Sequence, residues 1–566
     1  MCDDKSPFNK FILDSAGKYL QTVVVVDDRI YENTSGSVVS RLMAPPPRLR
    51  KAALKSAETA NEKSGNVEKP EEVSFHDVQN SFAKKRIICS LYQPKKNASF
   101  TEHSDVYNLC SAADVVIVDW DLHGDFGNKA TELVGNLIEQ SMKEVPHQLR
   151  LLLIYTMEVN LRSVADKIYE DLVQRIGKEA IDVNPTTQGL VITTDNARVV
   201  VLGKRVNTTL SEYAHFWVPE KKLAERTIDE FSRLASGLLQ SVVLRGIANL
   251  RENNRRILMR FHGGLDAAFL AHRALLLPDE AFGQIIPLLT DELRAVLEDT
   301  LGECPLGVGP AVDRIVTDWC TTHWKPGDDA QAFVGESGDP REFAKDVFCQ
   351  GLSIKGKYSA HQTGKIPKLV ASIKEVDGHL KWCNDQRRID LATYLLAGCL
   401  GDSCHQQLGS LMSQRIAYEN ARRALHLGVI LREMEGQRYM LCLQPVCDSV
   451  RINGKTRAFI FCLLDVPDTG KPFTHAVMDR NRNSIQLNYR PEISKCHVTN
   501  FTTGSDAVCA AKDDEGLFIF EDDGKNKYEW IAELKTEHAQ RAAEQFGRTL
   551  SRVGLTESEW LRLKAK

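Results

Sequence analysis

Short apolar, β-branched runs alternate with stretches of helical spacing in the N-terminal part of the chain. The runs lie at 22–26, 86–91, 113–119, 151–156 and 198–204. Runs of this length are typical of parallel strands that are buried on both faces, and the intervening helices provide the crossover connections. The pattern therefore predicts a doubly wound parallel α/β domain over residues 1–218.

The pattern changes after residue 218. Apolar residues recur at helical spacing to about residue 425, which predicts an all-α region over 219–425. The apolar stripe from Leu223 to Leu250 fits either a core helix or a coiled-coil seam. Strand-like runs at 438–444, 458–464 and 516–520 and a last helix at 532–553 then predict an α+β region over 426–566.

One segment interrupts the N-terminal pattern. Residues 31–74 lack periodicity, contain three consecutive prolines and end in a stretch rich in Lys, Glu, Ala and Ser. Such a composition is typical of a flexible insertion, because it offers too little apolar surface to form a core.

Composition and charge narrow the class of protein. The 566 residues exceed the size of one core, and 43% hydrophobic with 26% charged residues is a globular composition. A net charge of −4 gives no general electrostatic case for binding nucleic acid or membranes. The sequence has neither a bilayer-spanning apolar run nor a secretory signal, so we expect a cytoplasmic protein with reduced cysteines.

Chemically active residues stand at the ends of the predicted strands. Asp27 and Asp28 follow the first run, Asp119 ends the third, Thr156 the fourth and Lys204 the fifth. In a doubly wound sheet the functional crevice lies outside the carboxyl ends of the strands, so these side chains should converge.

The expected cluster indicates a metal and a reaction. Neighbouring carboxylates repel one another unless a cation lies between them, and an all-oxygen ligand set favours Mg²⁺. A carboxylate there can be the nucleophile in phosphoryl transfer, with the hydroxyl of Thr156 and the ammonium of Lys204 neutralising the charge on the transferred oxygens.

In this order and spacing the residues resemble the receiver domain of bacterial response regulators, a flavodoxin-like fold. The resemblance implies that Asp27, Asp28, Asp119 and the backbone carbonyl of Asp121 hold Mg²⁺. It also implies that Asp119 accepts a phosphoryl group from a histidine kinase or a phosphotransfer protein. Thr156 would be the switch hydroxyl and Lys204 the ion-pair partner.

The sequence also departs from the usual pattern of that family. Met157 stands where a small residue follows the switch hydroxyl, Val201 stands where an aromatic residue precedes the Lys, and His123 replaces a common proline. Asp121 and Glu158 would flank the reacting phosphoryl group and tune its lifetime.

The output of the remaining chain stays open between several readings. A degenerate receiver would act as a binding adaptor. Further expected partners are a downstream effector protein and, in a homodimer, a second copy of the chain. A Mg²⁺-dependent nuclease would use Asp523, Glu533 and Lys535, whereas the plain reading is a hairpin followed by a helix that starts near Ala532. The likeness of the whole chain to receiver-fused proteins of anti-phage operons is general and rests on no motif.

Cysteines and histidines offer a further metal alternative. The candidate zinc ligands are Cys399, Cys404, His405, Cys496 and His497. The competing interpretation is that these residues are buried or incidental.

Overall fold

The computed structural model describes residues 6–31, 74–143, 148–183, 185–204, 211–275, 285–301, 310–325, 339–350, 404–417, 421–468, 473–481, 483–550 and 562. Almost all of the predicted insertion at 31–74 lies outside these residues. The chain divides into two compact units. The first comprises Met1–His323 and Arg341–Ile354, and the second comprises Trp324–Pro340 and Lys355–Lys566.

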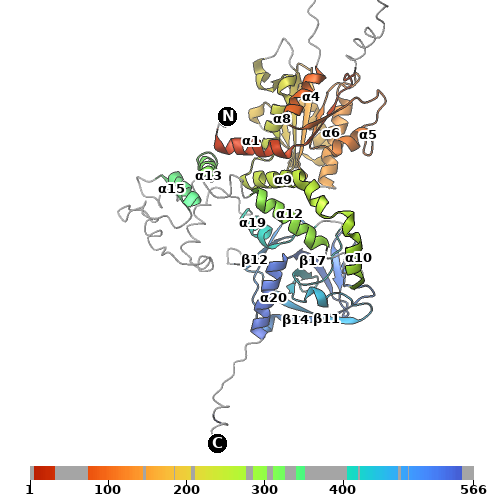
Figure 1. Ribbon diagram of the computed structural model, residues 1–566, viewed down its shortest axis with the longest axis vertical. Helices are drawn as coiled ribbons and strands as arrows, with labels where there is room; N and C mark the ends of the chain where they lie inside the picture. Colours follow the sequence, from red (N-terminus) through yellow and green to blue (C-terminus); the bar gives the residue numbers. More distant parts are fainter. Residues whose placement is uncertain are drawn as a thin grey trace, which may run out of the picture. The chain divides into compact units, whose positions relative to one another are not determined.

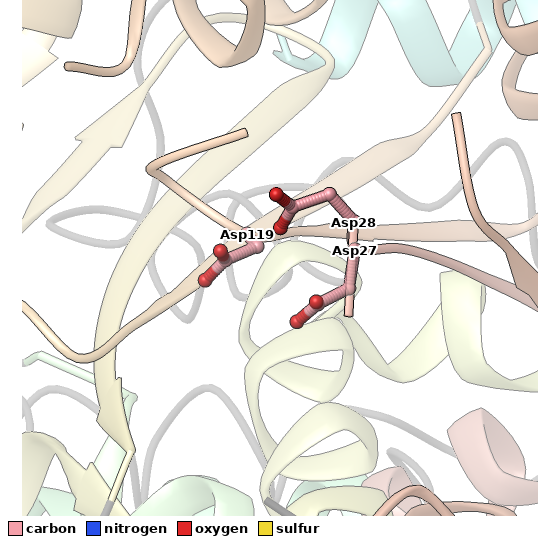
Figure 2. A group of neighbouring side chains, drawn as sticks. All are labelled: Asp27, Asp28 and Asp119. Atoms are coloured by element: carbon pink, nitrogen blue, oxygen red, sulfur yellow. The ribbon is translucent and has the colours of Figure 1, made fainter. Parts of the chain in front are cut away.

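The first unit contains an eight-stranded sheet whose centre is parallel (Figure 1). Its order is β2-β1-β3-β4-β7, and every neighbouring pair in this part is parallel. These strands confirm the predicted parallel sheet; their bounds are β1 Thr22–Val26, β2 Ile88–Tyr92, β3 Val115–Val118, β4 Arg150–Thr156 and β7 Ala197–Lys204. Because β1 and β3 are neighbours, the acids that follow them meet at one edge of the sheet (Figure 2).

Three short strands extend the sheet beyond the predicted pattern. Strand β6 (Val191–Thr193) pairs antiparallel with β7, and β5 (Asp182–Val183) pairs antiparallel with β6. Strand β8 (Trp217–Val218) runs parallel to the end of β7. Strands of two or three residues are too short to show a period-2 alternation, so the sequence pattern does not reveal them.

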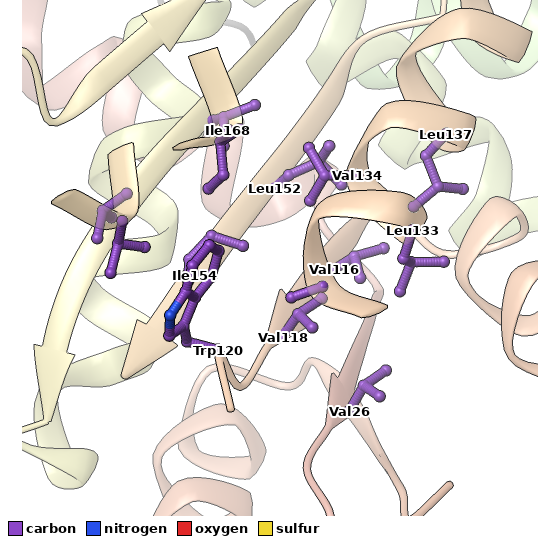
Figure 3. Close-up of a cluster of buried hydrophobic side chains, with 14 of the residues drawn as sticks. Val26, Val116, Val118, Trp120, Leu133, Val134, Leu137, Leu152, Ile154 and Ile168 are labelled. Atoms are coloured by element: carbon purple, nitrogen blue, oxygen red, sulfur yellow. The ribbon is translucent and has the colours of Figure 1, made fainter. Parts of the chain in front are cut away.

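Helices cover both faces of this sheet. One face packs against α1 (Pro7–Tyr19), α4 (Phe75–Lys84) and α8 (Leu223–Leu234). The other face packs against helices that contribute Leu133, Leu137 and Ile168 (Figure 3); they are α5 (Asp105–Ser111), α6 (Asn128–Lys143) and α7 (Leu161–Ile176). The strands between them are buried on both sides, which explains their uninterrupted apolar runs.

More helices follow α8 in the chain. The predicted stripe from Leu223 to Leu250 forms two helices, because α8 ends at Leu234 and α9 (Leu238–Arg260) begins after Gly237. Helix α9 packs on α1 and on α12. The helices after α9 are α10 (Asp266–Leu275), α12 (Ile285–Leu301), α13 (Pro310–Thr322) and α15 (Pro340–Gln350).

The second unit is α+β, as the sequence predicts. Helix α19 (Cys404–Ser413) precedes an antiparallel seven-stranded sheet of order β14-β11-β10-β9-β17-β16-β15 and a hairpin of β12 and β13. The strands are β9 Val429–Glu433, β10 Tyr439–Cys442, β11 Thr456–Leu464, β12 His475–Met478, β13 Ser484–Leu487, β14 Cys496–Thr502, β15 Ala511–Lys512, β16 Phe518–Glu521 and β17 Lys527–Glu533.

The start of the last helix differs from the prediction. Helix α20 spans Thr536–Leu550, whereas the pattern placed its start near Ala532. Ala532 and Glu533 belong to β17, where they pair with Ile430 and Val429 of β9. Pairing with a strand about 100 positions earlier in the sequence decides this boundary, and local spacing contains no sign of it.

Among the helices that the structure describes, none is both long enough and apolar enough to cross a membrane.

Candidate functional site

Three buried aspartates converge at the carboxyl edge of the parallel sheet. Val26 of β1 lies opposite Val118 of β3, and the backbone N–H of Asp119 donates to the carbonyl of Val26 at 2.8 Å. Each carboxylate contributes an oxygen to a group whose members lie within 4.8 Å of one another (Figure 2). The structure thus brings Asp27, Asp28 and Asp119 together, as strand order predicts.

Strand alternation sets which face each side chain serves. Asp27, Asp119 and Lys204 line one small cavity together with Tyr155 and Leu223, on the face covered by α4 and α8. Side chains one position further along a strand point to the opposite face.

Lys204 is the cation of the cluster. Its Nζ donates to Asp27 Oδ2 and to Asp119 Oδ1, both at 2.8 Å, and it lies 5.6 Å from the centre of the Tyr155 ring. Burial favours the neutral amine, but the carboxylates of Asp119 and Asp27 outweigh it and raise the pKa of Lys204. The ammonium therefore remains charged at neutral pH and binds two of the three carboxylates.

The surroundings of Asp119 disfavour the ionised form of its carboxyl group. Burial raises its pKa above the ordinary value, and the nearby carboxylates of Asp27 and Asp28 act in the same direction, while Lys204 opposes them. Among the described residues, the Lys204 ammonium and the Arg29 guanidinium, 3.9 Å from Asp28, still leave the three acids with excess negative charge, which favours binding of an additional cation.

Asp28 shows where such a cation fits. Its Oδ2 accepts a 2.8 Å hydrogen bond from the backbone N–H of His123. Its Oδ1 is buried and accepts no hydrogen bond in the described part of the chain, since Arg29 Nε is 3.9 Å away. A buried carboxylate oxygen without a donor, beside two more carboxylates, fits a hard divalent cation such as Mg²⁺.

His123 is a site residue whose contact the sequence did not reveal. Its ring Nε2 lies 2.9 Å from the carbonyl of Pro94, and its Nδ1 lies 3.3 Å from Asp28 Oδ2. Proline, common at this position in receivers, has no N–H to donate to Asp28. The substitution was visible in the sequence, but its contact depends on a loop in which His123 has φ 62°.

Thr156 and Asp121 occupy the rim. Thr156 ends β4, is 2% exposed, and lies opposite Gly203 of β7; its Oγ1 accepts from the Glu158 N–H at 3.0 Å. Asp121 is half-buried, and its Oδ1 accepts from the Phe126 N–H at 3.0 Å. The side chain of Asp121 therefore holds the β3–α6 loop, while Thr156 sits between the strand that leads to Asp119 and the strand of Lys204.

The nuclease residues of the second unit do not assemble. Asp523 lies in the turn between β16 and β17 and accepts from Thr502, whereas Glu533 ends β17 and pairs with Arg415. Lys535 donates to the carbonyl of Leu411. Six residues of β17, at 527–532, lie between the two acids in extended conformation, so the acids share no metal position.

The zinc alternative gains no support either. Cys399 lies outside the described residues, and Cys404 and His405 begin α19. Cys496 and His497 are adjacent on β14, so their side chains face opposite sides of the sheet. Within the described ranges, the three aspartates are the one group of acids, cysteines or histidines with the spacing of a metal site.

Comparison with known families agrees with this geometry. Residues 19–209 match the family model of the response receiver domain. The N-terminal region is similar to receiver domains. The match confirms the resemblance inferred from the acids, Thr156 and Lys204, and it ends before the helices that follow the receiver region. No curated protein and no solved structure matches the chain.

Proposed function

We propose that the chain is a response-regulator-type signalling protein that accepts a phosphoryl group on Asp119. The donor would be a histidine kinase or a phosphotransfer protein, as in the family that the receiver region resembles. Asp27, Asp28, Asp119 and the backbone carbonyl of Asp121 would hold Mg²⁺. The helical and C-terminal regions would receive the signal.

The observation that supports this proposal best is the convergence of Asp119 with an acid pair and a buried ammonium. A lone strand-end carboxylate is usually solvated, whereas Asp119 is 7% exposed and shares Lys204 with Asp27. This arrangement is poor for stability and suited to a reaction in which negative charge arrives.

The residues then have distinct parts in the transfer. An oxygen of Asp119 would bond to phosphorus as the bond from phosphorus to the donor's histidine nitrogen breaks, and that nitrogen keeps the bonding electron pair. Lys204 and the hydroxyl of Thr156 would bind the oxygens of the transferred group. Bound Mg²⁺ would supply charge neutralisation for these oxygens.

The route to the output would run through α8. Leu223 at its start lines the same cavity as Asp119 and Lys204, and α8 packs on β4 and β7. A shift of β4 and β7, the fourth and fifth strands predicted from the sequence, on phosphorylation would therefore move this helix. The break at Ala235–Gly237 means that the shift would have to pass from α8 to α9 through their separate contacts.

A second candidate function is a degenerate receiver that binds a partner without phosphorylation. Met157 favours it, because this exposed side chain is larger than the residue that receivers usually have next to the switch hydroxyl. For the signalling protein proposed above, we also propose a location in the cytoplasm and a role in bacterial anti-phage defence.

The test is intact-mass measurement of the full chain after incubation with acetyl phosphate and Mg²⁺. We expect one added phosphoryl group on the wild type and none on Asp119→Asn or after chelation of Mg²⁺. Asp166→Asn is the control, because Asp166 lies on the surface of α7, where it pairs with Arg162, and this variant should still accept the group. An unmodified wild type, under conditions that phosphorylate a control receiver, would support the adaptor instead.

A further inference from the structure

We propose that Cys462 and Cys496 of the second unit form a reversible disulfide bridge when a peroxide oxidises them. The two residues belong to neighbouring strands, β11 and β14, and stand directly opposite each other in the ladder. Both are free thiols in this structure. The inference concerns a different unit from the three aspartates and does not depend on phosphorylation of Asp119.

Backbone hydrogen bonds show which kind of pair the two cysteines form. The Ile460 carbonyl accepts from the N–H of Leu443, so it points to the β10 side of β11 and away from β14. The Asn500 carbonyl accepts from the N–H of Asp523, so it points away from β11. Backbone groups of every second residue point the same way along a strand, which extends both statements to the two cysteines. They therefore form a non-hydrogen-bonded pair, in which the Cα atoms approach to about 4.5 Å and the side chains are closest.

A second pair in the same ladder shows that side chains at such positions meet. Thr456 lies opposite Thr502, six positions from the cysteine pair along each strand and therefore on the same face of the sheet. The two hydroxyl oxygens lie 2.7 Å apart. A cysteine sulfur occupies the same place on its side chain as a threonine hydroxyl, so rotation about the Cα–Cβ bonds can bring the two sulfurs together. A non-hydrogen-bonded pair also has a Cα separation at the short end of the range for disulfides.

The two thiols differ in their surroundings. Cys462 is fully buried, and burial raises the pKa of its thiol to about 12, so the thiol stays protonated at neutral pH. It donates to the carbonyl oxygen of Arg490, which lies 3.5 Å from its Sγ. Cys496 is partly exposed and packs against the hydrophobic cluster to which Cys462 belongs. Cys496 is therefore the thiol that an oxidant in solution reaches first.

The oxidation has two steps. The Cys496 sulfur bonds to one oxygen of hydrogen peroxide as the O–O bond breaks, and the thiol proton leaves with the other oxygen as water, which gives a sulfenic acid. The Cys462 sulfur then bonds to the Cys496 sulfur, and the hydroxyl of the sulfenic acid leaves with the second thiol proton as water. The two thiols together lose two electrons and two protons, which the peroxide accepts. Their position opposite each other compensates for the small thiolate fraction of Cys462.

The bridge would constrain a defined part of the second unit. Residues 463–495 lie between the two cysteines and include the β12–β13 hairpin. A disulfide ties the ends of this segment together and removes conformations of the unfolded chain in which β11 and β14 are far apart. We therefore expect the second unit to resist denaturant better in the oxidised state, and a reducing thiol to reverse this change.

The test is cysteine mapping of the full, reduced chain after treatment with hydrogen peroxide under native conditions. Remaining thiols are blocked with an alkylating agent, and a non-reducing digest is analysed by mass spectrometry. We expect a cross-linked peptide that joins Cys462 to Cys496 within one chain and disappears on treatment with dithiothreitol. Cys447, which is exposed, is the internal control for exposure to the oxidant.

Substitutions separate the parts of the two thiols. In Cys462→Ser, we expect Cys496 to persist as a sulfenic acid that dimedone traps, whereas in Cys496→Ser, Cys462 should stay reduced. Cys442→Ser is the matched control, because Cys442 is also fully buried in this sheet but lies opposite Phe461. The bridge should form in this control as in the wild type. Circular dichroism and thermal melting would verify that the three variants fold.

Two results would overturn the proposal. The first is that both thiols stay reduced in a sample in which Cys447 is oxidised. The second is that Cys496 joins a different cysteine or a second chain, or proceeds to sulfinic acid while Cys462 stays reduced. Oxidation of Cys462 in Cys496→Ser would overturn the order of the two steps.

Discussion

Asp119 illustrates at the scale of one residue how a site can oppose the stability of its own fold. Its carboxyl group is buried beside Asp27 and Asp28, and it shares the ammonium of Lys204 with Asp27. The raised pKa of Asp119 means that the folded protein holds a proton there more readily than the unfolded chain does. Its contribution to stability is therefore full below the ordinary pKa and is lost as the pH rises through the raised folded pKa.

Replacement of Asp119 by Asn should consequently stabilise the protein at neutral pH in Mg²⁺-free buffer. We expect a higher free energy of unfolding for the variant, because the substitution removes a buried carboxylate while Lys204 keeps Asp27 as a partner. The gain should shrink as the pH falls towards the ordinary aspartate pKa, since wild-type Asp119 is then protonated. Denaturant unfolding at several pH values measures this difference, and a loss of stability at neutral pH would contradict the argument.

Elements of the sheet impose requirements that single residues do not reveal. Strand β8 continues the sheet beside the end of β7, and the ring of Trp217 lies directly over Gly203. A β-carbon added at Gly203 would lie 2.2 Å from that ring, well inside contact distance. Gly203 precedes Lys204, so this close approach also fixes the strand that presents the ammonium.

We therefore expect Gly203→Ala to lower the free energy of unfolding by about 1–3 kcal/mol, the usual cost of overpacking. The matched control is Gly547→Ala in α20, where an added β-carbon meets nothing within 4 Å. There the change should be neutral or stabilising by up to about 1 kcal/mol, because Ala favours the helix. Chemical denaturation of both variants measures the contrast, and equal effects would refute the packing argument.

At the scale of the whole molecule, the two compact units have separate cores. Phe231 is fully buried in the core that α8 forms with the parallel sheet. Phe459 is fully buried on one face of the antiparallel sheet of the second unit. The helices after the receiver region join the first unit as far as His323. The sequence-based boundaries at 218/219 and 425/426 remain predictions of where the functional modules begin.

Separate cores predict two unfolding transitions in calorimetry. Phe231→Ala should lower the free energy of unfolding in one transition, and Phe459→Ala should lower it in the other. Each loss should be about 3–5 kcal/mol, the usual cost of removing a buried aromatic ring. A single transition that both substitutions lower equally would show that the two units unfold together.

The parallel sheet, the order of the strand-end residues and the convergence of the three acids could all be predicted from the amino-acid sequence. These features follow from local periodicity and from the rule that the carboxyl ends of parallel strands share one edge. Asp27, Asp28 and Asp119 could therefore be named as neighbours although more than 90 positions separate Asp28 from Asp119.

The contacts that depend on long-range register became visible only in the folded chain. These contacts join residues that are distant in sequence. Lys204 donates to both Asp27 and Asp119, the backbone N–H of His123 donates to Asp28, and β17 pairs with β9. Local patterns cannot contain them, because they are set by how strands align and how loops return. For the same reason, only the fold showed that Asp523 and Glu533 stand apart, each with a different partner.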